Sequence, residues 1–336
     1  MSDDVKKGIV INDGAKRGVE VIAEPATIRV FVNVLEIVAE THLPQMRLPS
    51  EIQLPKDVVT KNVFNQKPLE NSTKYIQCGG VETKVVIDVE VLRNAKDISI
   101  ENTDKLTIFD YAVFCAVATC YLDNTLEFSR SRIHKLLTAD YKTKLTKIAE
   151  QNIVESIEKM RKIDVTIDYT PEAIKCNFVM PGGVAIIKNY MLPLKELILS
   201  YRGERTIRGY KFIDIPPLVQ YALVKNQIAK IPKEDLSVPS VNKTEKNISI
   251  LFYLVTRVIE MRENQKLENR INLKRLYDAV GAKNKVECER VRKVAEEILT
   301  YWKERNSFGL KGFSFVRHQK GFTSIEIDLA HRGVRG

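Results

Sequence analysis

The chain has 336 residues, 44% of them hydrophobic and 29% charged, which is typical of a folded protein with two or three domains. No run of about 18 uncharged apolar residues occurs, so the sequence predicts no membrane span. The first thirty residues are charged and lack an apolar core, so we expect no secretory signal.

The cysteines and histidines indicate neither disulfides nor a metal site. The number of cysteines is odd, and no pair has the C-x-x-C spacing of a zinc or redox site. The histidines are scattered, so we expect no metal site and no cofactor. This pattern favours a reducing, cytoplasmic location. The residues concerned are Cys78, Cys115, Cys120, Cys176, Cys288, His42, His134, His318 and His331.

The net charge of +10 is concentrated at the C-terminal end. Residues 1–100 carry a net charge of −1 and residues 101–240 a net charge of +3. Residues 241–336 hold 20 Lys and Arg against 12 Asp and Glu, a net charge of +8. A basic domain suits a polyanion such as nucleic acid, and the alternative is a basic surface that only keeps the protein soluble.

The first hundred residues predict no clear architecture. A helix over 26–41 and a strand over 84–92 are the elements that their apolar patterns indicate. From residue 101 the signals are stronger, and a first series of elements can be read. It comprises a helix over 106–124, a short strand over 126–128, a helix over 131–137, a helix over 144–162, and strands over 163–169 and 184–191.

Local signals mark the ends of these elements. Asp104 or Thr107 can cap the first helix, and Ser129 or Ser131 can cap the second. We expect the last two strands to pair across a long turn that contains the Pro181-Gly182-Gly183 triplet, which would make this hairpin the end of the series.

A second series in the same order follows at a spacing of about 140 residues. Gly281 is the expected stop of its second helix, and the segment from Arg317 to Gly321 is the tip of its hairpin. The elements are a helix over 247–265, a strand over 270–272, a helix over 273–281, a helix over 282–306 and a hairpin over 312–329.

Helix, strand, helix, turn, helix and hairpin is the order of a winged helix, which is a helix-turn-helix with an appended β-hairpin. The sequence therefore predicts an α+β protein with two such domains in tandem. The predicted divisions are an N-terminal segment of uncertain fold (1–100), a first winged helix with its joining segment (101–240), a second winged helix (241–329) and a tail (330–336).

The third helix and the hairpin of the second domain carry the residue types that DNA recognition needs. Arg and Lys can contact guanine edges or phosphates, and Asn can contact adenine. A solvated helix face and a solvated loop are the alternative. The candidate DNA-binding residues are Lys283, Asn284, Lys285, Arg290, Arg292 and Lys293 on the helix, with Arg317 and Lys320 on the hairpin.

The corresponding helix of the first domain is a weaker candidate, because Glu150, Glu155 and Glu158 dilute its positive charge. This domain could bind DNA, form a dimer, or do both. Its candidate DNA-binding residues are Lys142, Lys144, Lys147, Gln151 and Asn152.

Catalytic motifs are missing from the sequence. It contains no P-loop, no H-E-x-x-H, no G-x-S-x-G and no His-x-His pair. Asp164 and Asp168 share one face of a predicted strand and could hold Mg²⁺, but exposed acids on a wing strand are the simpler interpretation. We therefore expect no catalytic residues.

In its duplicated order, the chain resembles the replication initiator proteins of bacterial plasmids and mobile elements, which carry two winged helices in tandem. The resemblance covers about residues 101–329 and includes the joining segment RGYKFIDIPPLVQYALVKNQIAKIPKEDL, residues 208–236. About a hundred residues precede the first winged helix here, which is more than compact members of that family carry.

The resemblance implies binding to repeated double-stranded DNA sites at a replication origin, duplex opening and recruitment of host replication proteins. It also implies repression of the protein's own promoter, commonly by a homodimer formed through the first domain. The implied DNA-binding positions are Lys285 to Lys293 and Arg317 to Lys320, with Lys144 to Asn152 in the first domain.

Three other functions stay open on the sequence. A transcription regulator or a partition-type DNA-binding protein would use the same fold. A scaffold would use its winged helices to bind proteins. A nuclease would need metal-dependent cutting, which we do not expect.

Overall fold

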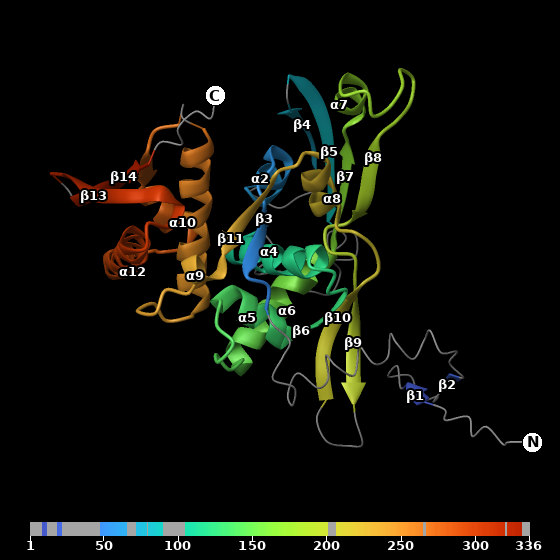
Figure 1. The fold of residues 1–336 in the computed structure, drawn as a ribbon, viewed down its shortest axis with the longest axis horizontal. Helices are drawn as coiled ribbons and strands as arrows, with labels where there is room; N and C mark the ends of the chain where they lie inside the picture. The colour runs from blue at the N-terminus through green and yellow to red at the C-terminus, as the bar shows by residue number, and fades with distance from the viewer. Residues whose placement is uncertain are drawn as a thin grey trace, which may run out of the picture.

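A computed structural model describes residues 9–11, 19–21, 48–65, 72–78, 80–89, 105–200, 206–264, 267–319 and 321–330. The helix predicted over 26–41 and the hairpin residue Lys320 lie outside these residues. Figure 1 shows a mixture of helices and antiparallel sheets, so the predicted α+β class is confirmed. No helix in the described part of the chain is long and apolar enough to cross a membrane.

The helices are α2 (Val58–Phe64), α4 (Ile108–Leu122), α5 (Arg130–Thr138), α6 (Lys147–Arg161), α7 (Thr170–Lys175), α8 (Pro217–Val224), α9 (Lys233–Leu236), α10 (Glu245–Glu263), α11 (Leu273–Ala279) and α12 (Lys285–Glu304). The strands are β1 (Ile9–Ile11), β2 (Val19–Val21), β3 (Glu51–Pro55), β4 (Ser72–Cys78), β5 (Val81–Val89), β6 (Glu127–Ser129), β7 (Ile163–Asp168), β8 (Ile186–Tyr190), β9 (Leu194–Ser200), β10 (Thr206–Phe212), β11 (Ile228–Pro232), β12 (Arg270–Asn272), β13 (Leu310–His318) and β14 (Gly321–Leu329).

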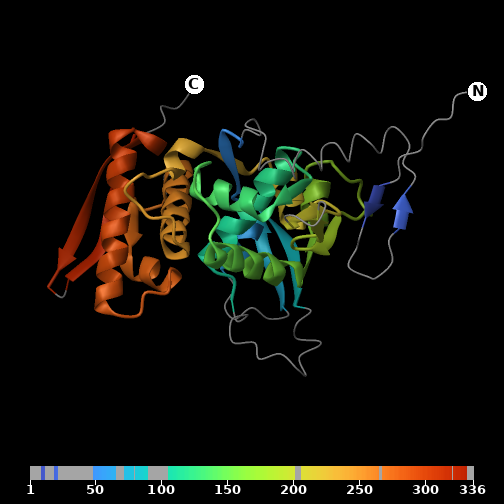
Figure 2. The ribbon, with the colours of Figure 1, turned by 90° about the horizontal axis from the view of Figure 1, so that it is seen from below.

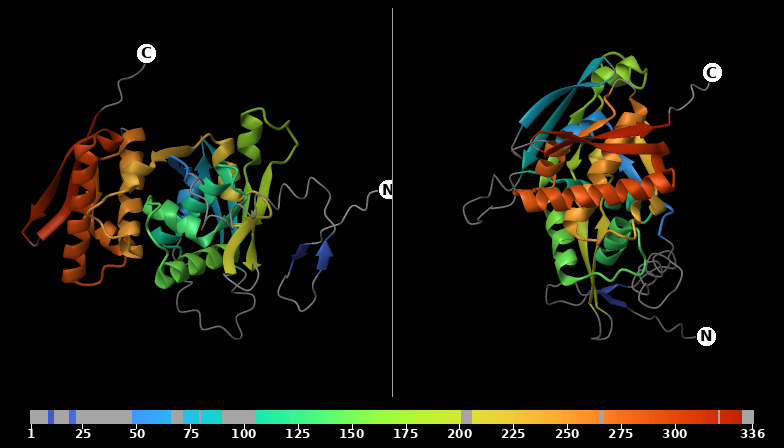
Figure 3. Two further views of the ribbon diagram at one scale, coloured as in Figure 1. Left: turned by 60° about the horizontal axis from the view of Figure 1, so that its bottom comes forward. Right: turned by 90° about the vertical axis from the view of Figure 1, so that its left-hand side faces the viewer.

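The second winged helix consists of α10, β12, α11, α12, β13 and β14, in the predicted order. Its sheet has the strand order β12-β14-β13, so the short strand before α11 pairs with the last strand of the hairpin. His318 pairs with Gly321, which leaves a two-residue connection at the tip. Figure 3 (right) shows α12 and the β13–β14 hairpin together on one outer face.

The ends of these helices follow the local signals in the sequence. Thr107 caps α4 in a capping box with Asp110, and Ser129 caps α5. Gly281 adopts φ +67° directly after the C-cap of α11, a conformation that glycine adopts without strain. Asn284 caps α12. The side chains of Thr107, Ser129 and Asn284 satisfy backbone N–H groups that a helix end leaves unpaired.

The first winged helix consists of α4, β6, α5, α6, β9 and β10. The hairpin predicted to be its wing is wrong. Its sheet has the order β6-β10-β9, which matches β12-β14-β13 of the second domain. The wing is therefore the β9–β10 hairpin, seen at the bottom of Figure 1, and the hairpin over 163–169 and 184–191 is not the wing.

The strands of that other hairpin, β7 and β8, do pair with each other, as predicted. They belong to a separate sheet of order β4-β5-β7-β8. Strand β10 can pair with β6 because Gly209 lies opposite Ser129, where a Cβ atom would come within 2.4 Å of the Phe128 carbonyl oxygen. The alternating pattern of two successive hairpins does not specify which one pairs with β6.

Strands from the N-terminal segment complete the sheets around the first winged helix. Strand β5 pairs with β7 along its length, and β3 pairs with β11 of the joining segment. The predicted boundary at residue 100 falls between β5 and α4. Strands on its N-terminal side thus pair with strands on its C-terminal side.

The two winged helices pack against each other through α4 and α10. Because α4 has β3, α5, α6 and α10 around it, residues from Phe109 to Cys120 are buried on every side of the helix. In the second domain, the indole Nε1 of Trp302 donates a hydrogen bond to the Asp235 carbonyl oxygen of the joining segment, 2.7 Å away. These contacts fix the second domain to the joining segment as well as to the first domain.

Candidate nucleic-acid interface

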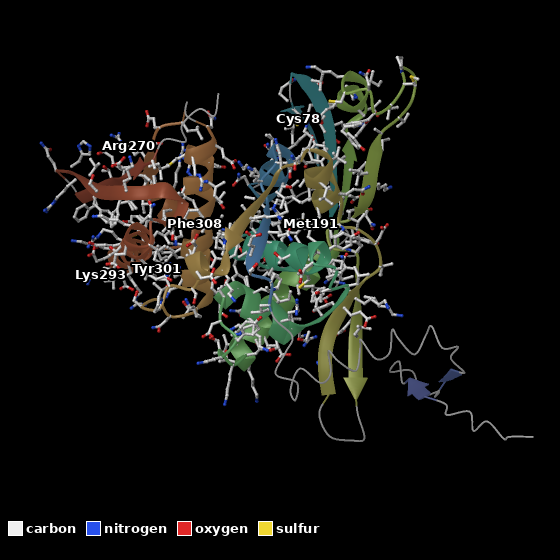
Figure 4. The ribbon with its side chains drawn as sticks, in the orientation of Figure 1. Cys78, Met191, Arg270, Lys293, Tyr301 and Phe308 are labelled. Carbon is white, nitrogen blue, oxygen red and sulfur yellow. The ribbon has the colours of Figure 1, made fainter. Side chains whose placement is uncertain are left out.

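Helix α12 has one buried face and one basic, exposed face. The buried face packs on the domain through Val291, Ala295, Ile298, Leu299 and Trp302. The exposed residues of its first half are Lys285, Val286, Glu289, Arg290 and Lys293. Figure 4 shows Lys293 on the outer side of the second domain. Helix α12 thus has the arrangement that a recognition helix needs, with long cationic side chains near its N-terminal end.

Polar groups at the N-terminal end of α12 also form hydrogen bonds with one another. The Asn284 side chain accepts a hydrogen bond from the Glu287 amide, and its Nδ2 donates to the Glu287 carboxylate. The backbone N–H of Lys283 and the Lys246 ammonium also donate to Glu287. These hydrogen bonds, the Lys283 one foremost, lower the pKa of Glu287. The side-chain amide of Asn284 is thus engaged in capping α12.

Arg292 is turned toward the hairpin and not outward. Its guanidinium forms ion pairs with Glu289 (2.6 Å) and Glu296 (3.1 Å), and its side chain is 14% exposed. The guanidinium carbon lies 5.3 Å from the Phe315 ring centre and 4.7 Å from that of Phe322. The hydrogen bond from Arg292 to Glu289 raises the pKa of the guanidinium. Arg292 therefore connects the recognition helix to both wing strands.

The wing carries an exposed cation near the end of β13. Arg317 is exposed, with its guanidinium carbon 5.8 Å from the centre of the Phe322 ring. His318, next to it, is exposed as well. Phe315 and Phe322 stack edge to face across the two strands at 5.9 Å. The Phe322 ring thus contacts both the partly buried guanidinium of Arg292 and the exposed one of Arg317.

In the first domain, α6 occupies the position of the recognition helix. Lys142, Lys144, Lys147 and Gln151 are exposed at or before its first turns. The Gln151 side chain donates to Glu155 at 2.8 Å, and Asn152 Nδ2 donates to Glu245 of α10 at 2.7 Å. Of these polar residues, Asn152 is thus engaged by the second domain, while the three lysines are exposed.

A second arginine that the sequence analysis missed connects α6 to the first wing. Arg130 at the start of α5 forms ion pairs with Glu150 of α6 (3.0 Å) and Glu196 of β9 (2.8 Å). Its guanidinium carbon lies 5.9 Å from the ring centre of Tyr210 on β10. Burial raises the pKa of Tyr210 to about 12. No local pattern marks Arg130, because its partners come from three separate elements.

The first wing is more basic than the hairpin predicted for it. Lys195 and Arg208 are exposed on β9 and β10. The connection between these strands, residues 201–205, has the sequence YRGER and lies outside the described residues. The Pro181-Gly182-Gly183 turn that was expected at the tip of the first wing therefore belongs to the β7–β8 hairpin.

The two recognition helices lie on either side of the first turn of α10 (Figure 2). Glu245 accepts a hydrogen bond from Asn152 of α6, and the next residue, Lys246, forms an ion pair with Glu287 of α12 at 3.1 Å. A groove of about 1580 Å³ runs between the domains here, bordered by Ile148 of α6 and Gly281 before α12. One turn of α10 thus positions the starts of both helices.

Within the described residues, no group of three His, Cys, Asp or Glu side chains could hold a metal ion. Asp168 accepts a hydrogen bond from the Thr170 amide at 3.1 Å, and Asp164 lies four residues earlier on β7. The five cysteines are all free thiols.

No protein-family model matches the chain, and no curated protein matches it. Solved structures of RctB domains are among those similar to it. The crystal structure of selenomethionine derivatives of domain 2 and domain 3 of RctB is 11% identical over 79% of this chain and 93% of that one, with a TM-score of 0.38. The crystal structure of RctB domains 2–3 is 14% identical over 79% and 92% of the two chains, also with a TM-score of 0.38. The two winged-helix domains are assigned from the strand order of their sheets.

Proposed function

We propose that this protein binds specific sequences of double-stranded DNA and initiates replication by binding repeated sites at an origin. The observation that carries the proposal is the repeated arrangement of a recognition helix beside a basic wing. The sheets have the same strand order, β6-β10-β9 and β12-β14-β13, and α6 and α12 hold the same position in the order of elements along the chain. Two connected DNA-binding domains suit DNA in which a short site is repeated.

The second domain would supply most of the sequence recognition. Lys285, Arg290 and Lys293 extend from the first half of α12, the part of a recognition helix that reaches base edges. Arg317 and Lys320 of the wing would contact phosphates beside the groove. Arg292 and Asn284 act in this account by holding the wing and the helix end in position. Because phosphate contacts supply much of the affinity, binding should weaken steeply as salt rises.

The first domain would contribute phosphate contacts from Lys142, Lys144 and Lys147, and from the exposed Lys195 and Arg208 of its wing. In this proposal the protein performs no chemistry on DNA. Duplex opening would follow from binding at repeated sites, and host replication proteins would act on the opened strand. In this proposal, a homodimer also uses these DNA-binding surfaces to repress the protein's own promoter.

The proposal is tested by band-shift titration with DNA from around the gene. Binding to tandem direct repeats beside an AT-rich tract is the expected result. Binding to a single palindrome over a promoter would instead identify a transcription regulator, and no shift with any duplex at low salt would leave a protein scaffold. Cutting of a supercoiled origin plasmid in Mg²⁺ would contradict the non-catalytic role.

Paired substitutions test the residue roles. Lys285→Ala with Arg290→Ala should abolish specific binding, because base contacts are lost. Arg317→Ala with Lys320→Ala should weaken binding to all sequences alike, because phosphate contacts carry no sequence information. A changed sequence preference in the wing variant would contradict the assigned roles.

A further inference from the structure

Both recognition helices expose a large apolar side chain at their second residue. Ile148 of α6 is 74% exposed, and Val286 of α12 is 71% exposed. Each follows a lysine at the first helical position, Lys147 and Lys285. Single exposed apolar residues are common on protein surfaces. The feature that needs an explanation is their recurrence at one structural position in two domains whose sequences otherwise differ.

Each of these residues belongs to the outer face of its helix. Arg290 and Lys293 lie four and seven residues after Val286, which places all three on one side of α12. Gln151, which is exposed, lies three residues after Ile148, so these two share a side of α6. The two apolar residues therefore stand at the N-terminal end of the polar faces that would read DNA.

Folding does not account for them. The apolar residues that hold the helices on their domains are buried, as Ile153 of α6 and Val291 of α12 show. Valine and isoleucine are also poorer helix formers than Lys, Gln or Ala, because their branched side chains lose rotamer freedom. A polar or alanine side chain would serve an exposed second position of a helix at least as well.

We infer that Ile148 and Val286 each contact the C5-methyl group of a thymine, and so determine which base pair is accepted at two positions of the site. This inference rests on the proposed function. The first residues of a recognition helix contact base edges in the major groove, where thymine presents the methyl group as an apolar contact. An exposed aliphatic side chain is the chemical complement of that group.

The experiment uses the full chain and a duplex recovered by selection from a random library. Each thymine of that duplex is replaced in turn by deoxyuridine, which removes the methyl group and leaves the hydrogen-bonding edges unchanged. Removing one buried methyl should weaken binding by about fourfold, which corresponds to about 0.8 kcal/mol. We expect this loss at two different thymines.

Two variants connect those thymines to the helices. Val286→Ser should bind more weakly than the native protein and lose its sensitivity to deoxyuridine at one of the two positions. Ile148→Ser should lose its sensitivity at the other position. Val184→Ser is the matched control, because Val184 is 68% exposed but lies just before β8, away from both recognition helices. It should retain the native affinity and both sensitivities.

The outcomes separate this inference from the proposed function. If a duplex is enriched but no deoxyuridine weakens binding by more than about twofold, or if both variants keep both sensitivities, the thymine contact is wrong while specific DNA binding stands. If no duplex is enriched, the proposed function fails, and the inference fails with it.

Discussion

Arg292→Met should destabilise the second winged helix without removing a DNA contact. The substitution keeps an unbranched apolar side chain and deletes the guanidinium. Two ion pairs along the helix, to Glu289 and Glu296, disappear. The contacts to the rings of Phe315 and Phe322 are lost as well. The wing should then be held to α12 less firmly.

The magnitude follows from these four contacts. Each ion pair between residues three or four apart on a helix stabilises by about 0.3–0.5 kcal/mol, and each cation–π contact by about 0.5–1 kcal/mol. The sum is roughly 2 kcal/mol. For a domain of this size that corresponds to a fall in melting temperature of about 8–16 °C. Urea unfolding followed by circular dichroism measures the change in free energy directly.

Arg290→Met is the matched control, because Arg290 is exposed two residues earlier on the same helix. It should leave stability within about 0.5 kcal/mol of the native protein. Because Arg290 is assigned a base contact, this variant should bind the specific site more weakly, whereas each lost phosphate contact lowers the slope of log K against log salt by about 0.9. The slope should stay unchanged in Arg292→Met. A native stability for Arg292→Met, combined with a reduced salt slope, would refute the role assigned to Arg292.

Other substitutions test the fold around the site. Gly209→Ala should destabilise the first domain by about 1–3 kcal/mol in urea unfolding, because its Cβ would meet the carbonyl of Phe128; Gly312→Ala, whose Cβ has 3.9 Å of space, should cost less than about 1 kcal/mol. Equal losses would contradict this strand pairing. Glu287 has a lowered pKa, so its stabilising effect is present above the ordinary value of 4.5 and is lost as pH falls through the folded value. On acidification, the melting temperature of Glu287→Gln should fall less than that of the native protein. The same pH dependence in both proteins would contradict the role assigned to Glu287. Thr107→Ala should remove about 1 kcal/mol by opening the capping box of α4, and an unchanged melting temperature would show that the cap contributes nothing.

The second winged helix could be predicted from sequence because its boundaries carry local signals. Gly281 ends α11, the basic start of α12 follows it, and the hairpin strands alternate in polarity up to a glycine-bearing turn. Each of these features depends on residues a few positions apart. The same holds for the caps of α4 and α5.

The first wing could not be assigned in this way, because the choice depends on contacts between distant segments. Two hairpins follow α6, and the β7–β8 hairpin pairs with β5, which lies about 80 residues earlier in the chain. The apolar pattern of β7 fits either partner. Gly209 does distinguish β10, but only once the close approach of β6 is known.

The roles of Arg292 and Arg130 could not be predicted from sequence either, because they too depend on contacts between separate elements. Arg292 has the same charge as Arg290 and lies two residues from it, yet one faces the wing and the other faces solvent. Arg130 gathers partners from α6, β9 and β10. Sequence spacing shows that a helix face is basic, while the tertiary contacts decide which cations remain available to DNA.

Fluorescence anisotropy of a labelled duplex, measured against the full chain at two salt concentrations, tests the central claim most directly. The duplex recovered by selection should bind at least about 10³-fold more tightly than a scrambled duplex of the same composition. Raising salt from about 50 to 200 mM should weaken binding to both duplexes by roughly 10³-fold or more. Equal affinity for the two duplexes, or binding that does not change with salt, would contradict the account.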